Sequence, residues 1–231
     1  WRRCKMFVAI EGIDGSGKTT CAENLFSMLN NGSNSPFLLR KKGFQVPNTY
    51  AGGMLSGLNE ILWEKGSTED RASISNGTWF GLLSAWFRLV DQEIVKPHSN
   101  AIVICDSWIE KIIARFSLKG DIAPALLDDL RNTVSQPDLT IFLDVGPEHA
   151  AKRKSEFGQA ESGTLDGYGP PSHDSFVAYQ TTVRGAYVDL LSAPNCVVIS
   201  CRSLSPEAVA AAALSEVLKA LQAGSEKVAA E

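Results

Sequence analysis

Five short apolar runs recur along the chain, and each has the length of a β-strand. They lie at residues 6–10, 37–39, 101–105, 139–143 and 196–199. Their hydrophobicity is continuous rather than alternating, which is typical of strands covered on both faces. Longer segments with helical spacing separate them, and this alternation favours a five-stranded parallel sheet flanked by helices on both faces. We therefore predict a single α/β domain over residues 1–231.

The helical pattern is strongest in four segments. They are residues 19–30, 71–96, 175–191 and 206–223. The last segment has Ser205 as a candidate N-cap, Pro206 in the first helical position and Gly224 just past its end. Residues 43–57 and 155–173 are rich in glycine and proline, so both are predicted to be mobile loops.

Composition and charge narrow the classes of function. Hydrophobic residues make up 44% of the 231 residues, which is ample for a packed core. The chain has 22 basic and 26 acidic residues, which gives a net charge of −4. It therefore lacks the excess of basic residues that is typical of a nucleic-acid binder. The 5 cysteines are widely spaced, and we expect neither a disulfide nor a metal site from them. No apolar run approaches the roughly 20 residues of a membrane-spanning helix, so we predict a cytoplasmic protein with no membrane partner.

The stretch after the first predicted strand carries the strongest chemical signal. Residues 12–19 read GIDGSGKT and fit the phosphate-binding pattern G-x-x-x-x-G-K-[ST] between a predicted strand and a predicted helix. Glycines let such a loop turn its N–H groups toward phosphate oxygens, and the following helix adds the positive end of its dipole. Lys18 is expected to reach the β and γ phosphates, and Thr19 to bind Mg²⁺ through its hydroxyl. The predicted nucleotide-binding residues of this P-loop are Gly12, Asp14, Gly15, Ser16, Gly17, Lys18, Thr19 and Thr20.

An acid follows the third predicted strand, at the end where parallel sheets bind ligands. Asp106 is therefore predicted to hold Mg²⁺ directly or through water, and together with the P-loop it predicts a P-loop NTPase fold. Two alternatives stay open: Asp106 could instead cap a helix starting near Trp108, and Asp144 could take the metal. The Gly146-Pro147 sequence after Asp144 favours a turn there.

Longer stretches resemble thymidylate kinases and related P-loop nucleoside monophosphate kinases. FVAIEGIDGSGKTT, residues 7–20, resembles the EG-[IL]-DG-[SA]-GK-[ST] opening of that family. VKPHSNAIVICDSW, TIFLDVGPEHAAKRK, YQTTVRGAYVDLL and VVISCRSLSPEAV are similar to later segments of the family, so nearly the whole chain takes part. The resemblance implies transfer of the γ-phosphoryl group of ATP, with Mg²⁺, to a nucleoside monophosphate, and dTMP is the first expectation.

The resemblance also implies roles for single residues. Asp14 matches the loop acid that contacts the sugar of the acceptor nucleotide. Arg153 matches a cation at the entrance of a mobile lid, over about residues 153–173, and Arg202 lies in the loop that matches the adenine side. The alternatives are a turn aspartate at position 14 and solvated side chains at the two arginines. The predicted catalytic residues are Lys18, Arg153 and Asp106.

The departures from the family pattern gather on the acceptor side. Asp106-Ser107-Trp108 replaces Asp-Arg-aromatic and lacks an arginine that would bind the acceptor phosphate. Arg115 stands where the family usually has an aromatic ring near the acceptor base. A phosphate monoester carries nearly two negative charges, so other cations must balance them. The candidates for acceptor binding, besides Asp14, are Arg40, Arg88, Lys111 and Arg115, with Lys41 and Lys42 as supporting cations.

The altered acceptor side leaves other functions open. One is a diverged P-loop kinase for another small phosphorylated acceptor, and another is a catalytically weak nucleotide-binding protein with a regulatory role. A guanine-dependent switch is disfavoured because the N/T-K-x-D signal is absent. Relatives in the family are commonly dimers, so a homodimer formed through the aromatic pairs of residues 71–96 is a further expectation. Within that segment, Trp79 and Phe80 are expected to pack in the core rather than stack on a base.

Overall fold

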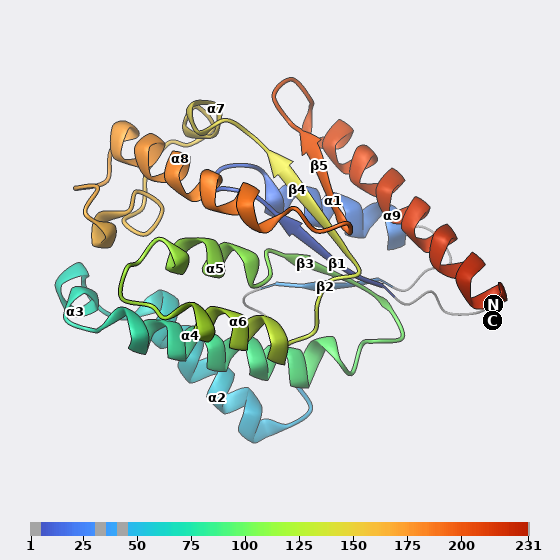
Figure 1. Ribbon diagram of the computed structural model, residues 1–231, viewed down its shortest axis with the longest axis horizontal. Coiled ribbons are helices and arrows are strands. Elements are labelled where there is room, and N and C mark those ends of the chain that lie inside the picture. The colour runs from blue at the N-terminus through green and yellow to red at the C-terminus, as the bar shows by residue number, and fades with distance from the viewer. Residues whose placement is uncertain (1–5, 31–35, 41–45, 231) are drawn as a thin grey trace.

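The computed structural model describes residues 6–30, 36–40 and 46–230. Within them, five strands form one parallel sheet in the order β2-β3-β1-β4-β5, which confirms the predicted sheet (Figure 1). Each of the five apolar runs lies in a strand, except that Ala101 precedes β3 by one residue. The strands are β1 (Met6–Glu11), β2 (Pro36–Leu39), β3 (Ile102–Asp106), β4 (Leu139–Asp144) and β5 (Cys196–Ser200).

Helices fill the connections and lie on both faces of the sheet (Figure 1). Among the described residues, none of them combines the length and the apolar character needed to cross a membrane. The helices are α1 (Lys18–Asn30), α2 (Thr49–Asn59), α3 (Thr68–Ala72), α4 (Asn76–Val90), α5 (Glu110–Ser117), α6 (Pro124–Thr133), α7 (Pro147–Ala151), α8 (His173–Leu190) and α9 (Pro206–Ala230). Two π-helical segments, η1 (Glu60–Glu64) and η2 (Asp91–Val95), continue α2 and α4, and η3 (Thr164–Asp166) is a 3₁₀ turn.

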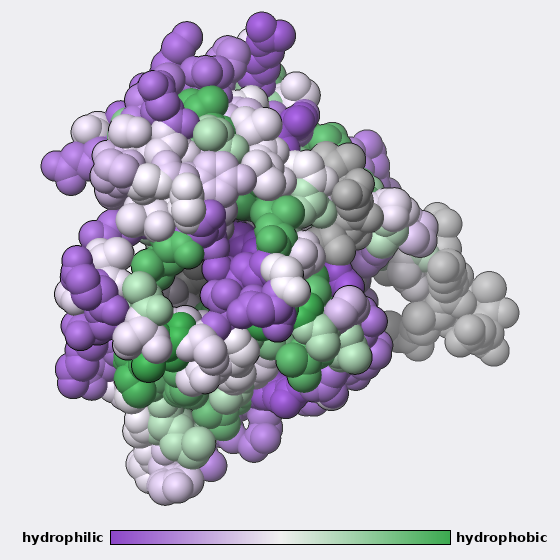
Figure 2. All heavy atoms as spheres, turned by 60° about the vertical axis from the view of Figure 1, so that its left-hand side comes forward, coloured by the Kyte–Doolittle hydropathy of each residue, from purple (hydrophilic) through white to green (hydrophobic). Residues whose placement is uncertain are grey.

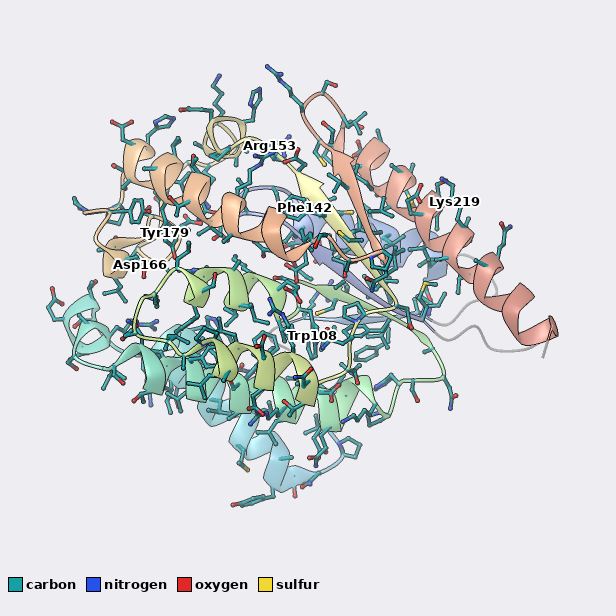
Figure 3. The ribbon with its side chains drawn as sticks, in the orientation of Figure 1. Trp108, Phe142, Arg153, Asp166, Tyr179 and Lys219 are labelled. Atoms are coloured by element: carbon teal, nitrogen blue, oxygen red, sulfur yellow. The ribbon has the colours of Figure 1, made fainter. Side chains whose placement is uncertain are left out.

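The two faces of the sheet bury two different cores, because alternate residues of a strand point to opposite sides. On one face, Val8 and Ile10 of β1 pack with α1 and α9. On the other face, Phe7 and Ala9 pack with α4 and α5. Phe142 of β4 packs against α8 (Figure 3). Helical cover on both sides explains why the strand residues are apolar without alternation.

The strand register brings the carboxyl ends of the central strands together. Ile10 of β1 is paired with Asp106 of β3, and Glu11 of β1 is paired with Phe142 of β4. Asp144, the last residue of β4, is paired with Ser200 of β5. Because all these strands run in one direction, the loops that follow them meet at one edge of the sheet.

The predicted helix over residues 71–96 differs from the structure in extent. The helix is interrupted after α3, and the next helix, α4, begins only at Asn76. Ser75 is the N-cap of α4, and its Oγ accepts a hydrogen bond from Thr78 N at 3.2 Å. Ile74 continues the apolar spacing across this break. The hydrophobic pattern alone therefore did not reveal that Ser75 caps a new helix, which is seen only in the backbone of the structure.

Two further predictions of local structure are wrong. The loop predicted over residues 43–57 is helical from Thr49, because Asn48 Oδ1 caps α2 by accepting from the backbone N–H groups of Tyr50 and Ala51. Residues 43–45 lie outside the described part of the chain. At the other end, α9 continues through Gly224 to Ala230. A glycine costs a helix only about 1 kcal/mol, which does not end it.

The aromatic pairs of α4 face the interior of the chain. Phe80, Trp86 and Phe87 are each 3% exposed, which confirms core packing for Phe80 and removes these rings from the predicted dimer face. Trp79 is partly buried, and its Nε1 donates to Arg71 O at 3.1 Å. The homodimer itself stays a prediction from the sequence.

Residues 155–172, which we call the roof segment, lie beside α8 and α5 and are largely irregular. The predicted loop is thus confirmed as far as Ser172, which caps α8, whereas its mobility stays a prediction. Contacts with the rest of the chain hold this segment in place. Lys119 forms an ion pair with Asp166, and Ser162 is fully buried. Figure 3 places Asp166 close to Tyr179 of α8.

Replacing Gly163 by alanine is expected to destabilise the fold more than the same change at Gly167. Both residues have a left-handed backbone, with φ of +66° and +85°, where a Cβ costs roughly 1–2 kcal/mol. Only at Gly163 would the Cβ meet a neighbour, 2.5 Å from Cδ2 of Tyr179, so a further loss of about 1–3 kcal/mol is expected. Thermal unfolding of the two variants measures this difference. Equal losses would contradict the packing of Gly163 on Tyr179.

Candidate active site

The loop between β1 and α1 has the conformation that its glycines permit. Gly12 has φ of +147°, and a Cβ there would lie 2.7 Å from Ser16 Oγ and 2.8 Å from Leu143 O. Glycine is therefore required both by the backbone angle and by the close approach of β4. The loop ends where α1 begins at Lys18, so the N–H groups of the first helical turn lie beside it.

Lys18 lies inside this loop. Its Nζ donates to Gly12 O at 2.9 Å and to Ile13 O at 2.7 Å, and the residue is 8% exposed. Burial lowers the pKa of Lys18 to about 8, and the nearby ammonium of Lys111 acts in the same direction. Two carbonyls are weak partners for a buried ammonium, so phosphate oxygens in their place would favour its charged form.

Thr19 and Asp106 form a pair of oxygen ligands at the edge of the sheet. Thr19 Oγ1 donates to Asp106 Oδ2 at 2.6 Å, although the two residues come from α1 and β3. A hydroxyl and a carboxylate beside a phosphate loop suit Mg²⁺, which needs few protein oxygens when it is also bound by phosphate and water. The residues therefore fit the metal. The alternative of an N-cap at Asp106 is wrong, because α5 begins at Glu110 and Ile109 occupies its N-cap position.

Asp144, the other candidate for the metal, is engaged elsewhere. Its Oδ1 accepts from Nε of Arg184 at 2.9 Å and from a terminal guanidinium nitrogen at 2.7 Å. This ion pair ties the end of β4 to α8. Thr19 is hydrogen-bonded to Asp106 and not to Asp144, so Asp106 is the acid that lies beside the P-loop hydroxyl.

A cavity of about 830 Å³ lies over the P-loop. Two cations from the residues between α7 and the roof segment approach it: Arg153 donates to Ser16 O at 3.4 Å and to Cys201 O at 3.2 Å, and Lys154 pairs with Glu161 at 3.0 Å. Figure 3 shows Arg153 near the end of β4, on the side of the P-loop. The residues lining this cavity include Asp14, Gly15, Ser16, Gly17, Lys18, Thr19, Thr20, Asp106, Lys111, Arg153, Lys154 and Glu161.

Arg202 is exposed in the loop between β5 and α9 and does not line this cavity. Its neighbour Cys201 is buried and supplies the carbonyl that Arg153 contacts. The loop predicted for the adenine side is thus beside the P-loop, while the Arg202 side chain stays in solvent.

Asp14 and Lys111 meet on the other side of the P-loop. Lys111 Nζ lies 2.5 Å from Asp14 Oδ1, and the two side chains are only 10% and 20% exposed. Burial alone would raise the pKa of Asp14, but the charges of Lys111, Lys18 and Arg115 hold it well below its usual value. The alternative of a turn aspartate is wrong, because the Asp14 carboxylate contacts α5 and α8 rather than its own backbone.

Arg115 lies one helical turn after Lys111. Its Nε donates to Tyr179 Oη at 2.9 Å, its guanidinium carbon lies 5.4 Å from the centre of that ring, and a terminal nitrogen donates to Ala160 O. It lines a second cavity, of about 670 Å³, whose walls also include Trp63 and Trp79. Figure 2 shows that the face toward α3 and the roof segment is hollowed, with hydrophobic and hydrophilic residues at the rim. The wall of this cavity mixes aromatic rings with charged side chains, which besides Arg115 include Arg71, Lys119 and Asp166.

Two predicted acceptor residues are not in either cavity. Arg40, after β2, pairs with Glu23 of α1 at 3.0 Å. Arg88 forms an ion pair with Asp129 of α6, because its position on α4 turns it toward that helix. Both side chains are instead engaged in ion pairs outside these two cavities. The supporting residues at positions 41 and 42, Lys41 and Lys42, lie outside the described residues.

The sequence interpretation missed Glu11. The residue is 0% exposed at the end of β1, and its carboxylate accepts from Trp108 N at 2.7 Å, Ser107 Oγ at 3.0 Å and Tyr187 Oη at 2.9 Å. Burial raises its pKa despite these donors. Ser107 has φ of +67°, a conformation that residues other than glycine rarely adopt. An acid closing an apolar strand was the available signal, since a buried carboxylate needs partners.

The glycine loop at the end of β1, with an acid at the end of the neighbouring strand, defines a P-loop nucleoside-triphosphate-binding protein. A family profile described as thymidylate kinase matches residues 10–166. The chain therefore belongs to the thymidylate kinase family.

Individual relatives agree with this assignment. The probable thymidylate kinase of Methanosphaera stadtmanae is 32% identical over 151 residues, which are 64% of this chain and 71% of that protein. The thymidylate kinase of Ehrlichia chaffeensis is 31% identical over 159 residues, covering 66% and 72% of the two chains. The crystal structure of thymidylate kinase from Ehrlichia chaffeensis matches with a TM-score of 0.64 at 23% identity, over 93% of this chain and 98% of that one. The structural match shows the same fold.

Affinity for ATP is expected to fall as the pH rises through about 8, the pKa of Lys18. A lysine with a lowered pKa is charged below that pH and neutral above it, and only the charged form pairs with phosphate. The dissociation constant should rise about tenfold between pH 7 and 9, with proton uptake on binding near pH 9. Calorimetric titration in buffers of different ionisation enthalpy measures both, and Lys18→Met should abolish the slope. Flat affinity without proton uptake would contradict the buried position of the ammonium.

Proposed function

We propose that this chain transfers the γ-phosphoryl group of ATP to a nucleoside monophosphate, with dTMP as the first acceptor. As a member of the thymidylate kinase family, the chain is an ATP-dependent nucleoside monophosphate kinase. One observation carries the proposal: the P-loop with Lys18 and the Asp14–Lys111 pair face the same cavity, so donor phosphates and an acceptor can meet there. The family assignment does not favour the alternatives of a regulatory protein or a kinase for another acceptor.

On the donor side, Lys18 would hold the β and γ phosphates and exchange its carbonyl partners for their oxygens. Thr19 and Asp106 would hold Mg²⁺, which when bound neutralises phosphate charge. Arg153 is the proposed catalytic cation, and Lys154 lies next to it at the cavity. The loop containing Cys201 and Arg202 would border the adenine. These assignments follow from the placement of the side chains at or beside the P-loop.

On the acceptor side, we assign the phosphate-binding cation to Lys111. Ser107 occupies the position that resembles the family's arginine, but it is 6% exposed and its hydroxyl is bonded to Glu11. Lys111 instead lines the cavity and lies beside Asp14, the proposed contact of the acceptor sugar. Arg115 would face the base and sugar from the adjoining cavity. The acceptor charge is thus balanced from α5.

The reaction requires only positioning and charge neutralisation. A phosphate oxygen of the acceptor attacks the γ phosphorus in line, the bond from that phosphorus to the β–γ bridging oxygen breaks, and ADP leaves with the negative charge. Lys18 and Arg153 would hold the charge that spreads over the transferred group. The roof segment, part of the proposed lid over residues 153–173, would exclude water and so limit hydrolysis of ATP. A homodimer and a cytoplasmic location remain predictions from the sequence.

Release of ADP from ATP with Mg²⁺ is expected to depend on an added nucleoside monophosphate. We expect the highest kcat/KM with dTMP among dTMP, dUMP, CMP, UMP, AMP and GMP. The control Lys18→Ala should lose turnover, because it removes the cation that holds the β and γ phosphates. Binding of ATP without turnover on any of the six acceptors would overturn the proposed function.

Replacing Lys111 by methionine is expected to impair the acceptor and spare the donor. The KM for dTMP should rise at least about tenfold while the KM for ATP changes less than about threefold, because a charge-assisted contact to the acceptor phosphate is lost. The preference for binding dTMP over thymidine should also disappear. Steady-state kinetics and equilibrium titrations measure these quantities.

Lys219→Met is the matched control, since Lys219 pairs with Glu216 on the exposed side of α9, far from Arg153 (Figure 3). It should behave as the unmodified chain. A dTMP preference that survives in Lys111→Met would place the phosphate-binding cation elsewhere.

A further inference from the structure

Gln180 is a buried amide that touches both the P-loop and the roof segment. It lies on α8 and is 1% exposed. Its Oε1 accepts from Asp14 N at 3.1 Å, and its Nε2 donates to Asp14 Oδ2 at 3.3 Å and to Glu161 O at 2.7 Å. One side chain therefore holds the backbone and the carboxylate of the loop acid, and also the backbone of the roof segment.

The chemistry of these partners fixes the orientation of the amide. Asp14 N–H can only donate, so an oxygen must face it. Asp14 Oδ2 and Glu161 O can only accept, so both hydrogens of the amide nitrogen are needed. The flipped amide would set a donor against Asp14 N and an acceptor against each of these two oxygens. The three contacts thus form one complete arrangement for a buried glutamine.

The position of Gln180 is also a departure from the family pattern. The F-x-x-V-R-x-x-Y segment that the chain resembles has its aromatic residue three positions before the valine, and Val183 places that position at 180. Here the aromatic residue is Tyr179, one position earlier. Neighbouring residues on a helix point in different directions, so Tyr179 contacts Arg115 while Gln180 contacts Asp14. The substitution therefore belongs with the altered acceptor side.

The residues that Gln180 holds line the phosphate cavity. Asp14 and Glu161 both face that cavity, whereas Gln180 lies behind them. Next to Glu161, the carbonyl of Ala160 accepts from Arg115 of α5. Residues 160–161 of the roof segment are therefore hydrogen-bonded to Arg115 of α5 and, through Gln180, connected to Asp14.

We propose that Gln180 is a positioning residue that couples the seating of the roof segment to the orientation of Asp14 toward the acceptor. The inference rests on the proposed function, because it assigns Asp14 to the acceptor sugar. When the roof segment is seated, the amide holds the Asp14 carboxylate in place. When Glu161 moves away, the Gln180 amide loses one of its three hydrogen-bond partners and holds the Asp14 carboxylate less firmly, so acceptor binding and closure of the cavity favour each other.

Gln180→Met tests this coupling, since methionine has a similar volume and makes none of the three hydrogen bonds. Amide hydrogen exchange over residues 158–166 should become at least about tenfold faster in the absence of nucleotides. The KM for dTMP should rise at least about tenfold, with the KM for ATP changed less than about twofold. Thr181→Val is the matched control, because Thr181 is an exposed neighbour on α8 bonded within its own helix. It should change neither quantity.

Unchanged exchange in the roof segment, or equal changes in both KM values, would overturn the proposal. The exchange measurement needs no turnover, so it tests the coupling even if the unmodified chain phosphorylates no nucleotide, an outcome that would defeat the proposed function alone. Gln180→Glu provides a second test if the methionine variant does not fold. It keeps the oxygen that accepts from Asp14 N but sets a carboxylate against Asp14 Oδ2, so the same two changes are expected and their absence overturns the proposal.

Discussion

The buried carboxylate of Glu11 connects the parts of the molecule on which the site depends. It ends β1, and it accepts hydrogen bonds from the turn after β3, at Ser107 and Trp108, and from Tyr187 of α8. A fully buried carboxylate is tolerated only when such donors surround it. The turn and α8 are therefore fixed relative to β1. Asp106 directly precedes that turn, so its contact with Thr19 follows from the same constraint.

Ser107 is hydrogen-bonded to Glu11, and the cations that we propose for the acceptor lie instead on α5. A side chain that is 6% exposed and bonded inward cannot present a charge to the cavity. Lys111 and Arg115 are four residues apart and share one face of their helix. Asp14 lies against Lys111, so the buried positive charge on this face has a partner. Lys111 and Arg115 thus lie on one face of α5, with Asp14 paired to Lys111.

The donor side and the sheet could be predicted from the sequence because their signals are local. The P-loop occupies residues 12–19, and strands covered on both faces are apolar throughout. Helix boundaries were less predictable, because Asn48 and Ser75 act as caps within segments whose composition indicated a loop or an unbroken helix.

The acceptor side depends on contacts between distant positions, which spacing along the chain does not encode. Gln180 and Asp14 are 166 residues apart, and Arg88 is turned away by an ion pair with Asp129 that depends on how α4 and α6 pack. The resemblance to the family identified which positions had changed. Only the fold showed that Lys111 and Arg115 reach the cavities while Arg40 and Arg88 do not.

The most direct test of this account is a crystal structure of the chain with dTMP and a non-hydrolysable ATP analogue. A dTMP phosphate oxygen is expected within about 3 Å of Lys111 Nζ, with the Asp14 carboxylate on the sugar and the Gln180 amide still bonded to Asp14. A dTMP phosphate held by other cations, with Lys111 still paired only to Asp14, would contradict it.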